Sequence, residues 1–288
     1  MPGTITQELL RILVAQKASG KTCAWISPQN AQAFFYGNPA RQPQQPVLQS
    51  QPQPPPSKPR PIVQPQPIEQ PPVPKPEPVK IVPTGLVANH NWEELEATAL
   101  ACKACPLYAG RKNLAFGCGC RQSKLMFIGE GPGEEEDRQG KPFVGRAGQL
   151  LTNMIAAMGL DRESQDPEKG CYIANIIKCR PPGNRNPSIE EGKACIQFLH
   201  RQIQLVNPKA IILLGAVPLN FLMGKRGITQ ARGNWLEYNG IPVMPTFHPA
   251  YLLRFEKSKD RFVQEKRKVW SDLQQVMALL NLKRPKTT

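Results

Sequence analysis

The sequence predicts an α/β fold in which helices cover a parallel β-sheet, and two observations support this prediction. From Lys124 onward, short apolar runs alternate with stretches of helical periodicity, as in parallel strands joined by crossover helices. The block that contains this alternation, residues 91–282, has the length of an ordinary single domain. We therefore expect the chemistry of the chain to lie in this block.

The strands and helices can be assigned in order along the block. Four apolar runs predict the strands, which cover residues 124–129, 171–178, 209–215 and 243–247. Helical spacing of apolar residues predicts helices over residues 147–159, 188–206, 216–224 and about 260–280. Ser188 and Glu191 have the spacing of a capping box, which marks the start of the second helix. The segment 233–243 predicts a β-hairpin ahead of the last strand.

The first 90 residues have a different composition. Of the 32 prolines, 17 lie between Pro39 and Pro83, among repeated glutamines. Such a stretch cannot bury enough apolar surface to offset its ordering entropy, so we expect a disordered tether over residues 38–90. Residues 1–37 predict a short N-terminal segment with an amphipathic helix, and residues 283–288 form a basic tail. The helix and the proline-rich arm are both candidate contacts for a protein partner.

The charge of the chain favours a polyanionic partner. The formal net charge is +15, and 29 basic residues stand against 19 acidic ones beyond residue 91, so the domain itself is basic. This excess fits nucleic acid, although a basic surface alone does not establish binding. No apolar run reaches the roughly 18 residues that a membrane span needs. We expect a soluble, monomeric, cytoplasmic protein without a membrane partner.

Eight cysteines in a chain of this kind favour metal ligation over a disulfide framework. Cys102 and Cys105 form a C-x-x-C pair. Cys179 directly follows the second strand and Cys195 lies on the next helix, so both could reach a loop that carries the first pair. Four thiolates suit zinc and an iron-sulfur cluster equally well. The others are a rival pair, Cys118 and Cys120, and two residues expected to be unliganded, Cys23 and Cys171.

Unusual segments follow three of the expected strands, at the end of the sheet where α/β folds bind ligands. They are GEGPGEEED after the first strand, KCRPPGNRNP after the second and HPAYLLR after the last. The glycines of GEGPG would let the backbone approach a ligand closely, although a tight structural turn explains them about as well. The acidic run 134–137 is typical of a solvated helix start, and one of its carboxylates could instead position water or border a pocket.

Two polar residues within these surroundings are candidates for ligand contacts. Asn175 has apolar neighbours in the sequence, where an unpaired amide costs roughly 1 to 3 kcal/mol. A backbone group is the commoner partner, but a carboxamide can also read the edge of a base. His248 stands at the end of the last strand and is either structural or, beside Asn175 and the glycine turn, a donor to a developing oxyanion.

Taken together, these segments resemble the family 4 uracil-DNA glycosylases, the iron-sulfur branch of bacteria and archaea. The resemblance covers about residues 102–280 and depends on the order and spacing of CKACPL, GEGPGEEEDRQGKPFVGRAGQLL, YIANIIKCRPPGNRNP, Cys195 and HPAYLLR. It implies a three-layer α/β/α fold with a four-stranded parallel sheet. It also implies a DNA-repair hydrolase that removes uracil from single- or double-stranded DNA. The cofactor implied is a structural 4Fe-4S cluster on Cys102, Cys105, Cys179 and Cys195.

The resemblance also implies roles for residues around the base. Phe143 would stack on the flipped uracil, and Asn175 would donate to O4 and accept from N3–H. His248 and the backbone amide of Gly131 would stabilise the charge that develops on O2. The best-known branch of the superfamily carries an aspartate at the position of Gly131, so a strong general base is not expected there.

Further roles concern water and the DNA strand. Glu130 or Glu136 would position the attacking water or exclude the thymine methyl group, and the sequence does not assign the two roles. On the DNA side, the resemblance implies a wedge and phosphate contacts. The wedge would be Leu252 or Leu253, and the phosphate contacts Arg185 and Arg254.

Three other functions are alternatives to catalytic removal of uracil. A covalent binder of the same superfamily uses a histidine in a basic insertion, and KCRPPGNRNPS contains none. The chain could instead be an iron-sulfur redox or DNA-binding accessory protein without glycosylase turnover. The third alternative is an interaction module that acts through the proline-rich arm.

Overall fold

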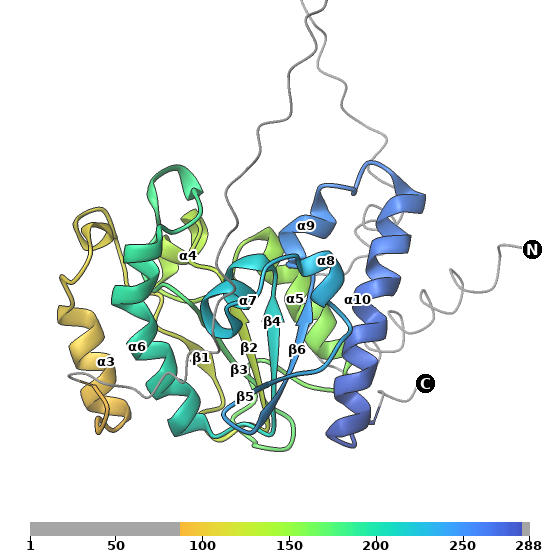
Figure 1. The fold of residues 1–288 in the computed structure, drawn as a ribbon, viewed down its shortest axis with the longest axis horizontal. Helices are drawn as coiled ribbons and strands as arrows, with labels where there is room; N and C mark the ends of the chain where they lie inside the picture. Colours follow the sequence, from red (N-terminus) through yellow and green to blue (C-terminus); the bar gives the residue numbers. More distant parts are fainter. Residues whose placement is uncertain (1–86, 284–288) are drawn as a thin grey trace, which may run out of the picture. The chain divides into compact units, whose positions relative to one another are not determined.

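The computed structural model describes residues 87–283, so the predictions for residues 1–86 and 284–288 lie outside the described residues. Within this range the chain forms a six-stranded sheet (Figure 1). In chain order its strands are β1 (Cys118–Gly119), β2 (Leu125–Gly129), β3 (Tyr172–Asn175), β4 (Ala210–Leu214), β5 (Leu236–Tyr238) and β6 (Ile241–Thr246). Their spatial order is β1-β3-β2-β4-β6-β5.

The four-stranded parallel sheet is confirmed as the centre of this larger sheet. Strand β2 pairs in parallel with both β3 and β4, and β4 pairs in parallel with β6. The predicted four-stranded sheet did not include the other two strands, β1 and β5. They are short and pair antiparallel at the two edges, β1 with β3 and β5 with β6. The predicted hairpin is β5–β6, and it turns at Asn239 and Gly240, both with positive φ.

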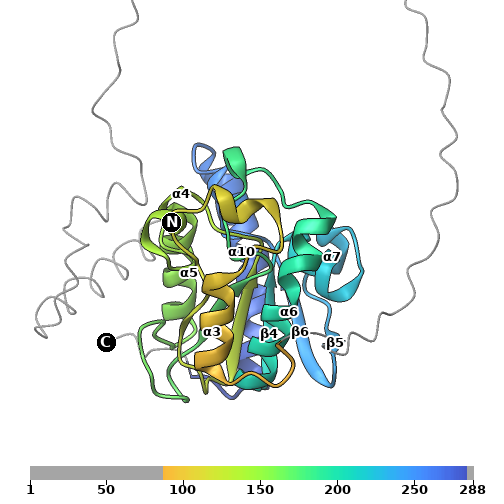
Figure 2. The same ribbon diagram turned by 90° about the vertical axis from the view of Figure 1, so that its left-hand side faces the viewer.

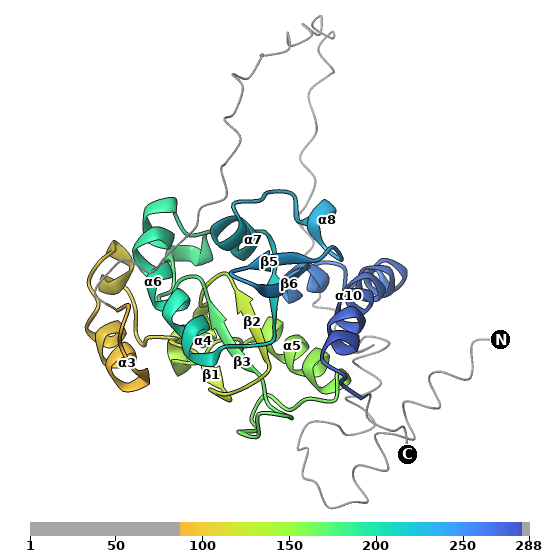
Figure 3. The same cartoon turned by 60° about the horizontal axis from the view of Figure 1, so that its bottom comes forward.

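Helices cover both faces of the sheet, as Figures 2 and 3 show. The α-helices of the described residues are α3 (Trp92–Ala101), α4 (Glu134–Gln139), α5 (Arg146–Ala157), α6 (Ile189–Val206), α7 (Ala216–Met223), α8 (Ile228–Ala231), α9 (Pro249–Leu253) and α10 (Lys259–Leu279). Two 3₁₀ helices, η1 (Pro106–Ala109) and η2 (Pro182–Asn184), lie in connecting segments. Each helix within residues 87–283 is too short or too polar to span a lipid bilayer.

The two faces of β2 divide the hydrophobic core, because side chains alternate along a strand. Leu125 and Phe127 lie in a cluster with residues of α5, α9 and α10. Met126 and Ile128 face the opposite way and lie in a cluster with residues of α6 and α7. These central strands are buried on both faces, as a parallel sheet between helices requires.

Local sequence signals explain where the principal helices begin. Helix α6 has the predicted capping box, in which Ser188 Oγ accepts from the Glu191 amide and the Glu191 carboxylate accepts from the Ser188 amide. Helix α3 begins with the same arrangement at Asn91 and Glu94. A small core with Leu95 of α3 and Phe198 of α6 holds the two helices together. This packing fixes the segment that follows α3, which carries Cys102 and Cys105.

Candidate functional site

The carboxyl ends of neighbouring parallel strands bring the predicted pocket residues to one edge of the sheet. Gly129 ends β2 and pairs in register with Asn175, which ends β3. Two strands away, β6 ends at Thr246, and His248 follows two residues later. Because the strands are parallel, these ends lie at the same rim, which is where α/β folds place their ligands.

Phe143, Asn175 and His248 lie together at this rim. A Cβ placed on Gly129 would lie 2.5 Å from Asn175 Oδ1 and also 2.5 Å from Phe143 Cζ, so both side chains border the same point of the backbone. The ring centroids of Phe143 and His248 are 5.5 Å apart and the rings are tilted by 32°. Phe143 therefore lies close to both Asn175 and His248, and the absence of a side chain at Gly129 makes room for Phe143 and Asn175.

Asn175 offers an unused donor and an unused acceptor. Its side chain is 1% exposed, and among the described residues neither Oδ1 nor Nδ2 has a hydrogen-bond partner. Leaving such a group unpaired costs roughly 1 to 3 kcal/mol, which a structural asparagine would avoid. The backbone of Asn175 is held independently, because Lys178 Nζ donates to its carbonyl oxygen over 2.8 Å. The amide is thus presented rigidly while its hydrogen-bonding groups stay open.

His248 is held as a neutral donor. It is the N-cap of α9, and its Nδ1 accepts from the Ala250 amide over 3.1 Å. Acceptance at Nδ1 leaves the proton of the neutral ring on Nε2. Burial, with the positive charge of Arg254 adding to it, lowers the pKa of His248 to about 4. At neutral pH the ring is therefore uncharged and can donate from Nε2.

The turn after β2 brings its backbone close to the segment that follows β3. A Cβ on Gly131 would lie 2.6 Å from Ile177 Cγ1, so a larger residue there would force the turn away. The pairing of the two segments continues past the strand ends, because the Ile177 amide donates to the Glu130 carbonyl over 3.2 Å. The Glu130 side chain is half-buried, and this burial raises the pKa of its carboxyl above the usual range.

Glu136 is occupied by the backbone around the turn. Its Oε2 accepts from the Gly133 amide over 3.1 Å, which caps the start of α4. Its Oε1 accepts from the amides of Val144 and Gly145 over 2.9 and 2.8 Å. The carboxylate therefore joins the glycine turn to the loop that carries Phe143. The sequence did not distinguish the roles of Glu130 and Glu136. Among the described residues, the Glu130 carboxylate accepts no hydrogen bond from a backbone amide, whereas the Glu136 carboxylate accepts three.

The residues expected to contact DNA differ in how much of their surface is exposed to solvent. Leu252 is 1% exposed and belongs to the core between the sheet, α5 and α10, so in this conformation it cannot enter a base stack. Leu253 is half-buried and Arg254 is exposed. Arg185 forms two hydrogen bonds of 2.8 and 2.6 Å with the buried carboxylate of Glu191. This pairing gives Arg185 a structural partner at the start of α6.

The four predicted metal ligands line one pocket. It lies between the end of α3, η1, the segment after β3 and α6, and its walls include Cys102, Cys105, Cys179 and Cys195. The rival cysteines Cys118 and Cys120, with Cys171, belong instead to β1, the adjoining turn and the segment that enters β3. Within residues 87–283, no three His, Cys, Asp or Glu side chains meet around a point that could hold a single metal ion. The four thiols surround a space instead.

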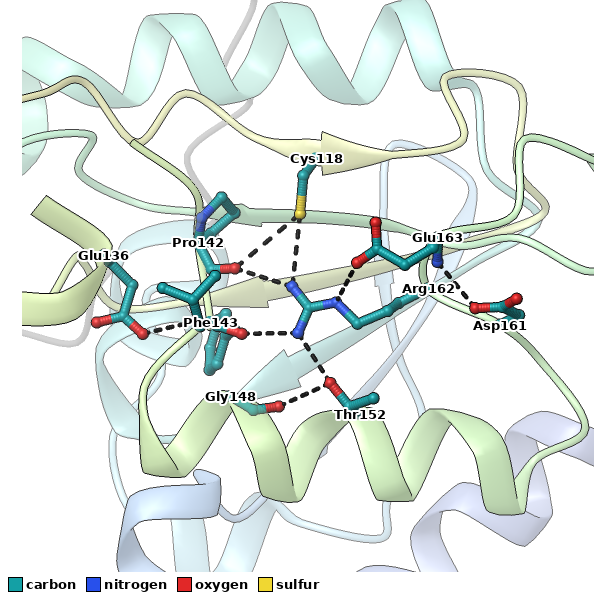
Figure 4. Close-up of polar contacts among 10 residues, drawn as sticks. Cys118, Glu136, Pro142, Phe143, Gly148, Thr152, Asp161, Arg162 and Glu163 are labelled. Atoms are coloured by element: carbon teal, nitrogen blue, oxygen red, sulfur yellow. Dashed lines mark hydrogen bonds and ion pairs between the residues drawn. The ribbon is translucent and has the colours of Figure 1, made fainter. Parts of the chain in front are cut away.

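Two basic residues in or beside these sites were not identified from the sequence. Lys178 is fully buried, lines the cysteine pocket, and donates to Asn175 and to Gln202 Oε1 over 2.7 Å. Arg162 is 8% exposed and contacts the loop that carries Phe143 (Figure 4). A lysine within the apolar run YIANIIK could have drawn attention to Lys178. No local pattern distinguishes Arg162, because its partners lie about 20 positions earlier in the chain.

Comparison with known proteins identifies the family to which the chain belongs. The model of the uracil DNA glycosylase superfamily matches residues 116–274. A type-4 uracil-DNA glycosylase of Thermotoga maritima is 50% identical over 156 residues, which span 53% of this chain and 78% of that protein. Type-4 uracil-DNA glycosylases of Sulfurisphaera tokodaii and Archaeoglobus fulgidus are 41% and 32% identical and are covered over 75% and 90% of their lengths.

The chain therefore belongs to the uracil-DNA glycosylase superfamily, whose model covers more than half of its length. Within the superfamily it groups with the type-4 enzymes, as the identities to three of them indicate. The resemblance inferred from its motifs is thus confirmed, and so is the α/β fold that the resemblance implies.

Proposed function

We propose that this chain excises uracil from DNA by hydrolysing the N-glycosidic bond and leaves an abasic site. The observation that carries the proposal is the Asn175 amide, which is buried at the ligand edge of the sheet with both polar atoms unpaired. Membership of the uracil-DNA glycosylase superfamily supports the same activity. A base within a duplex cannot reach such a pocket, so the uracil nucleotide must be flipped out of the stack.

Recognition of uracil would use stacking and paired hydrogen bonds. Phe143 would lie against the ring of the extruded base. Asn175 Nδ2 would donate to uracil O4 and Oδ1 would accept from N3–H. Cytosine reverses this donor and acceptor pattern, so its entry would leave the buried amide unpaired and would be strongly disfavoured.

Bond cleavage would be assisted by a placed donor. Negative charge develops on uracil O2 as the glycosidic bond breaks, and an oriented donor lowers the energy of that state. The neutral His248 ring, with its Nδ1 occupied by the Ala250 amide, would donate from Nε2 to O2. We assign the backbone amide of Gly131 as a second donor at the turn.

We assign water positioning or exclusion of the thymine methyl group to Glu130 rather than to Glu136. The raised pKa of Glu130 reflects a carboxyl in a desolvated position beside the pocket. Glu136 would contribute indirectly, because its carboxylate is shared among the amides of Gly133, Val144 and Gly145.

The decisive experiment measures uracil release from DNA. Asn175→Ala and His248→Ala should each lose most of the excision rate while keeping a wild-type thermal transition. Asn153→Ala on the exposed face of α5 and His90→Ala before α3 are matched controls and should retain the rate. Near wild-type excision by both pocket variants would remove these residues from the proposed site.

We further propose that Cys102, Cys105, Cys179 and Cys195 hold a 4Fe-4S cluster. Their shared pocket supports one group held by all four thiols, and the resemblance to the iron-sulfur branch of the family favours a cluster over a zinc ion. Two cationic side chains support an anionic group there, since Lys178 lines the pocket and Arg111 Nη1 lies 3.5 Å from Cys179 Sγ. The bound group would supply structural cross-linking of the segment after α3 to the segment after β3.

Iron and sulfide analysis tests this assignment. Cys179→Ala should lose iron and the associated brown colour, and it should yield less soluble protein. Cys171→Ala is the matched control, because Cys171 is also buried but lies outside the pocket. A purified wild type that contains zinc in place of iron, or stable protein without metal, would contradict the cluster.

Contacts to DNA outside the pocket are proposed for Leu253 and Arg254. Leu253 is the member of the leucine pair with exposed surface, and it would fill the vacated stack. Arg254 is exposed beside His248 and would hold a phosphate. The basic excess of the domain supports attraction of either single- or double-stranded DNA.

A further inference from the structure

The backbone of Phe143 has an unfavourable conformation. Its φ is +56°, in the left-handed region that side chains with a Cβ rarely adopt. The other non-glycine residues of the described chain with positive φ are all asparagines, which tolerate this region best. A bulky aromatic residue there is strained, and such strain persists only where the surroundings impose it.

Arg162 supplies much of that restraint. Its Nη1 donates to the Phe143 carbonyl over 2.6 Å, and its Nη2 donates to the Pro142 carbonyl over 3.0 Å (Figure 4). The same Nη1 also donates to Thr152 Oγ1 over 2.9 Å, which fixes the guanidinium on α5. The planar fork of arginine can hold two consecutive carbonyls at once, which a lysine ammonium cannot do in the same geometry.

Two further contacts hold the same peptide from other directions. A Cβ on Gly148 would lie 2.0 Å from the Phe143 carbonyl carbon, so α5 packs directly on this peptide. On the far side, Glu136 accepts from the Val144 amide. The Phe143 peptide is thus held by Arg162, by α5 and by Glu136. We expect a shift of the guanidinium to move Phe143 as well.

The environment of the guanidinium indicates that packing alone does not explain it. Arg162 is 8% exposed, and burying a charged group is costly unless it is paired. Its nearest carboxylate, Glu163, is an exposed side chain whose Oε1 lies 3.5 Å from Nε, and Nε has no hydrogen bond among the described residues. The strongest contacts of this buried cation thus include the carbonyls of Pro142 and Phe143, one on either side of the strained Phe143 Cα.

We propose that Arg162 is a positioning residue that sets the Phe143 ring for stacking on the extruded uracil. The inference rests on the proposed function, because it assigns Arg162 a role in the same pocket. Arg162 touches neither the base nor the reacting atoms. It acts through the Phe143 backbone, whose strained conformation places the ring beside Asn175 and His248.

A double-mutant cycle between Arg162 and Phe143 tests the proposal. Arg162→Lys should lower kcat for uracil excision by roughly 10- to 100-fold, as misplacing a pocket group by about 1 Å does. It should also weaken inhibition by free uracil, which reports stacking directly. In a Phe143→Ala background the same change should alter kcat by less than about twofold, because the ring that Arg162 positions is gone.

A matched arginine separates positioning from general stability. Arg201 also donates from a guanidinium to a backbone carbonyl, that of His90, away from the pocket. Arg201→Lys should leave kcat and uracil inhibition unchanged. If Arg162→Lys does not fold, Thr152→Val provides a second variant, because it removes the hydroxyl that holds Nη1 and should produce a smaller loss of the same kind.

The possible outcomes are distinct. Equal losses from Arg162→Lys with and without Phe143, or a wild-type kcat and wild-type uracil inhibition in Arg162→Lys, would overturn the inference while leaving uracil excision intact. A wild-type protein that releases no uracil would overturn the proposed function and this inference with it.

Discussion

Substitution of Gly129 offers a direct test of the pocket, because an added side chain would collide with Asn175 and Phe143, the two groups that should hold the base. In Gly129→Ala the new Cβ would lie 2.5 Å from both Asn175 Oδ1 and Phe143 Cζ. Ordinary contact begins at 3.4 Å, so each group must withdraw by about 0.9 Å. Displacement of this size costs up to about 100-fold in rate, and we expect kcat for uracil release to fall by roughly 10- to 100-fold.

The accompanying loss of stability should be of similar size in free energy but should leave the protein folded. Overpacking by one methyl group costs roughly 1 to 3 kcal/mol, and the backbone at Gly129 has no positive φ that would add strain. Gly110→Ala is the matched control, because nothing lies within 4 Å of the Cβ it would add. Single-turnover excision together with urea unfolding separates the two effects. A folded Gly129→Ala protein with the wild-type rate would refute the placement of the base between Phe143 and Asn175.

Three other predictions concern pH, an ion pair and DNA binding. Burial lowers the pKa of His200 from 6.5 to about 4, so the unfolded chain binds more protons between these values and the free energy of unfolding falls as pH falls through this window. The His200 share of the loss is roughly 3 kcal/mol, and His200→Gln should therefore lose less stability than the wild type between pH 7 and pH 4, measured by urea unfolding. Arg185→Ala should lower the melting temperature, because it leaves the buried Glu191 carboxylate without its cationic partner, and an unchanged melting temperature would contradict this role. Arg254→Ala should instead leave stability unchanged and reduce the salt dependence of DNA affinity by about one phosphate contact, whereas an unaltered salt slope would argue against a phosphate at this position.

The central sheet and its main helices were predictable because each has a signal of its own. The apolar runs at residues 124–129 and 209–215 are long enough to identify buried strands, and the Ser188 capping box marks the start of α6. The edge strand β1 spans only Cys118 and Gly119, too few residues to show periodicity. It forms because the neighbouring strand offers open hydrogen-bonding groups, and a sequence pattern does not reveal this.

The sequence predicted which side chains lie together in the pocket, but it did not predict the contacts that hold them in place. Asn175 could be singled out because an amide among apolar residues needs an explanation. The function of Glu136 as a backbone acceptor depends on residues up to nine positions away, and its carboxylate contacts follow from the loop that folds back on α4. Leu252 and Leu253 are adjacent and equally apolar, so only the orientation of α9 determines that Leu252 is buried and Leu253 half-buried.

The pairing between the end of β2 and the segment after β3 bears on how the protein responds to denaturation. The amides of Ile176 and Ile177 donate to the carbonyls of Gly129 and Glu130 over 3.0 and 3.2 Å, so the spacing between the turn and Asn175 is set by the same ladder that joins the two strands. The selectivity that we propose for Asn175 would thereby be built into the scaffold, and little ordering entropy would be lost when the base is captured. Discrimination and global folding should accordingly disappear in one cooperative transition, without an intermediate range in which a loosened enzyme attacks the wrong base.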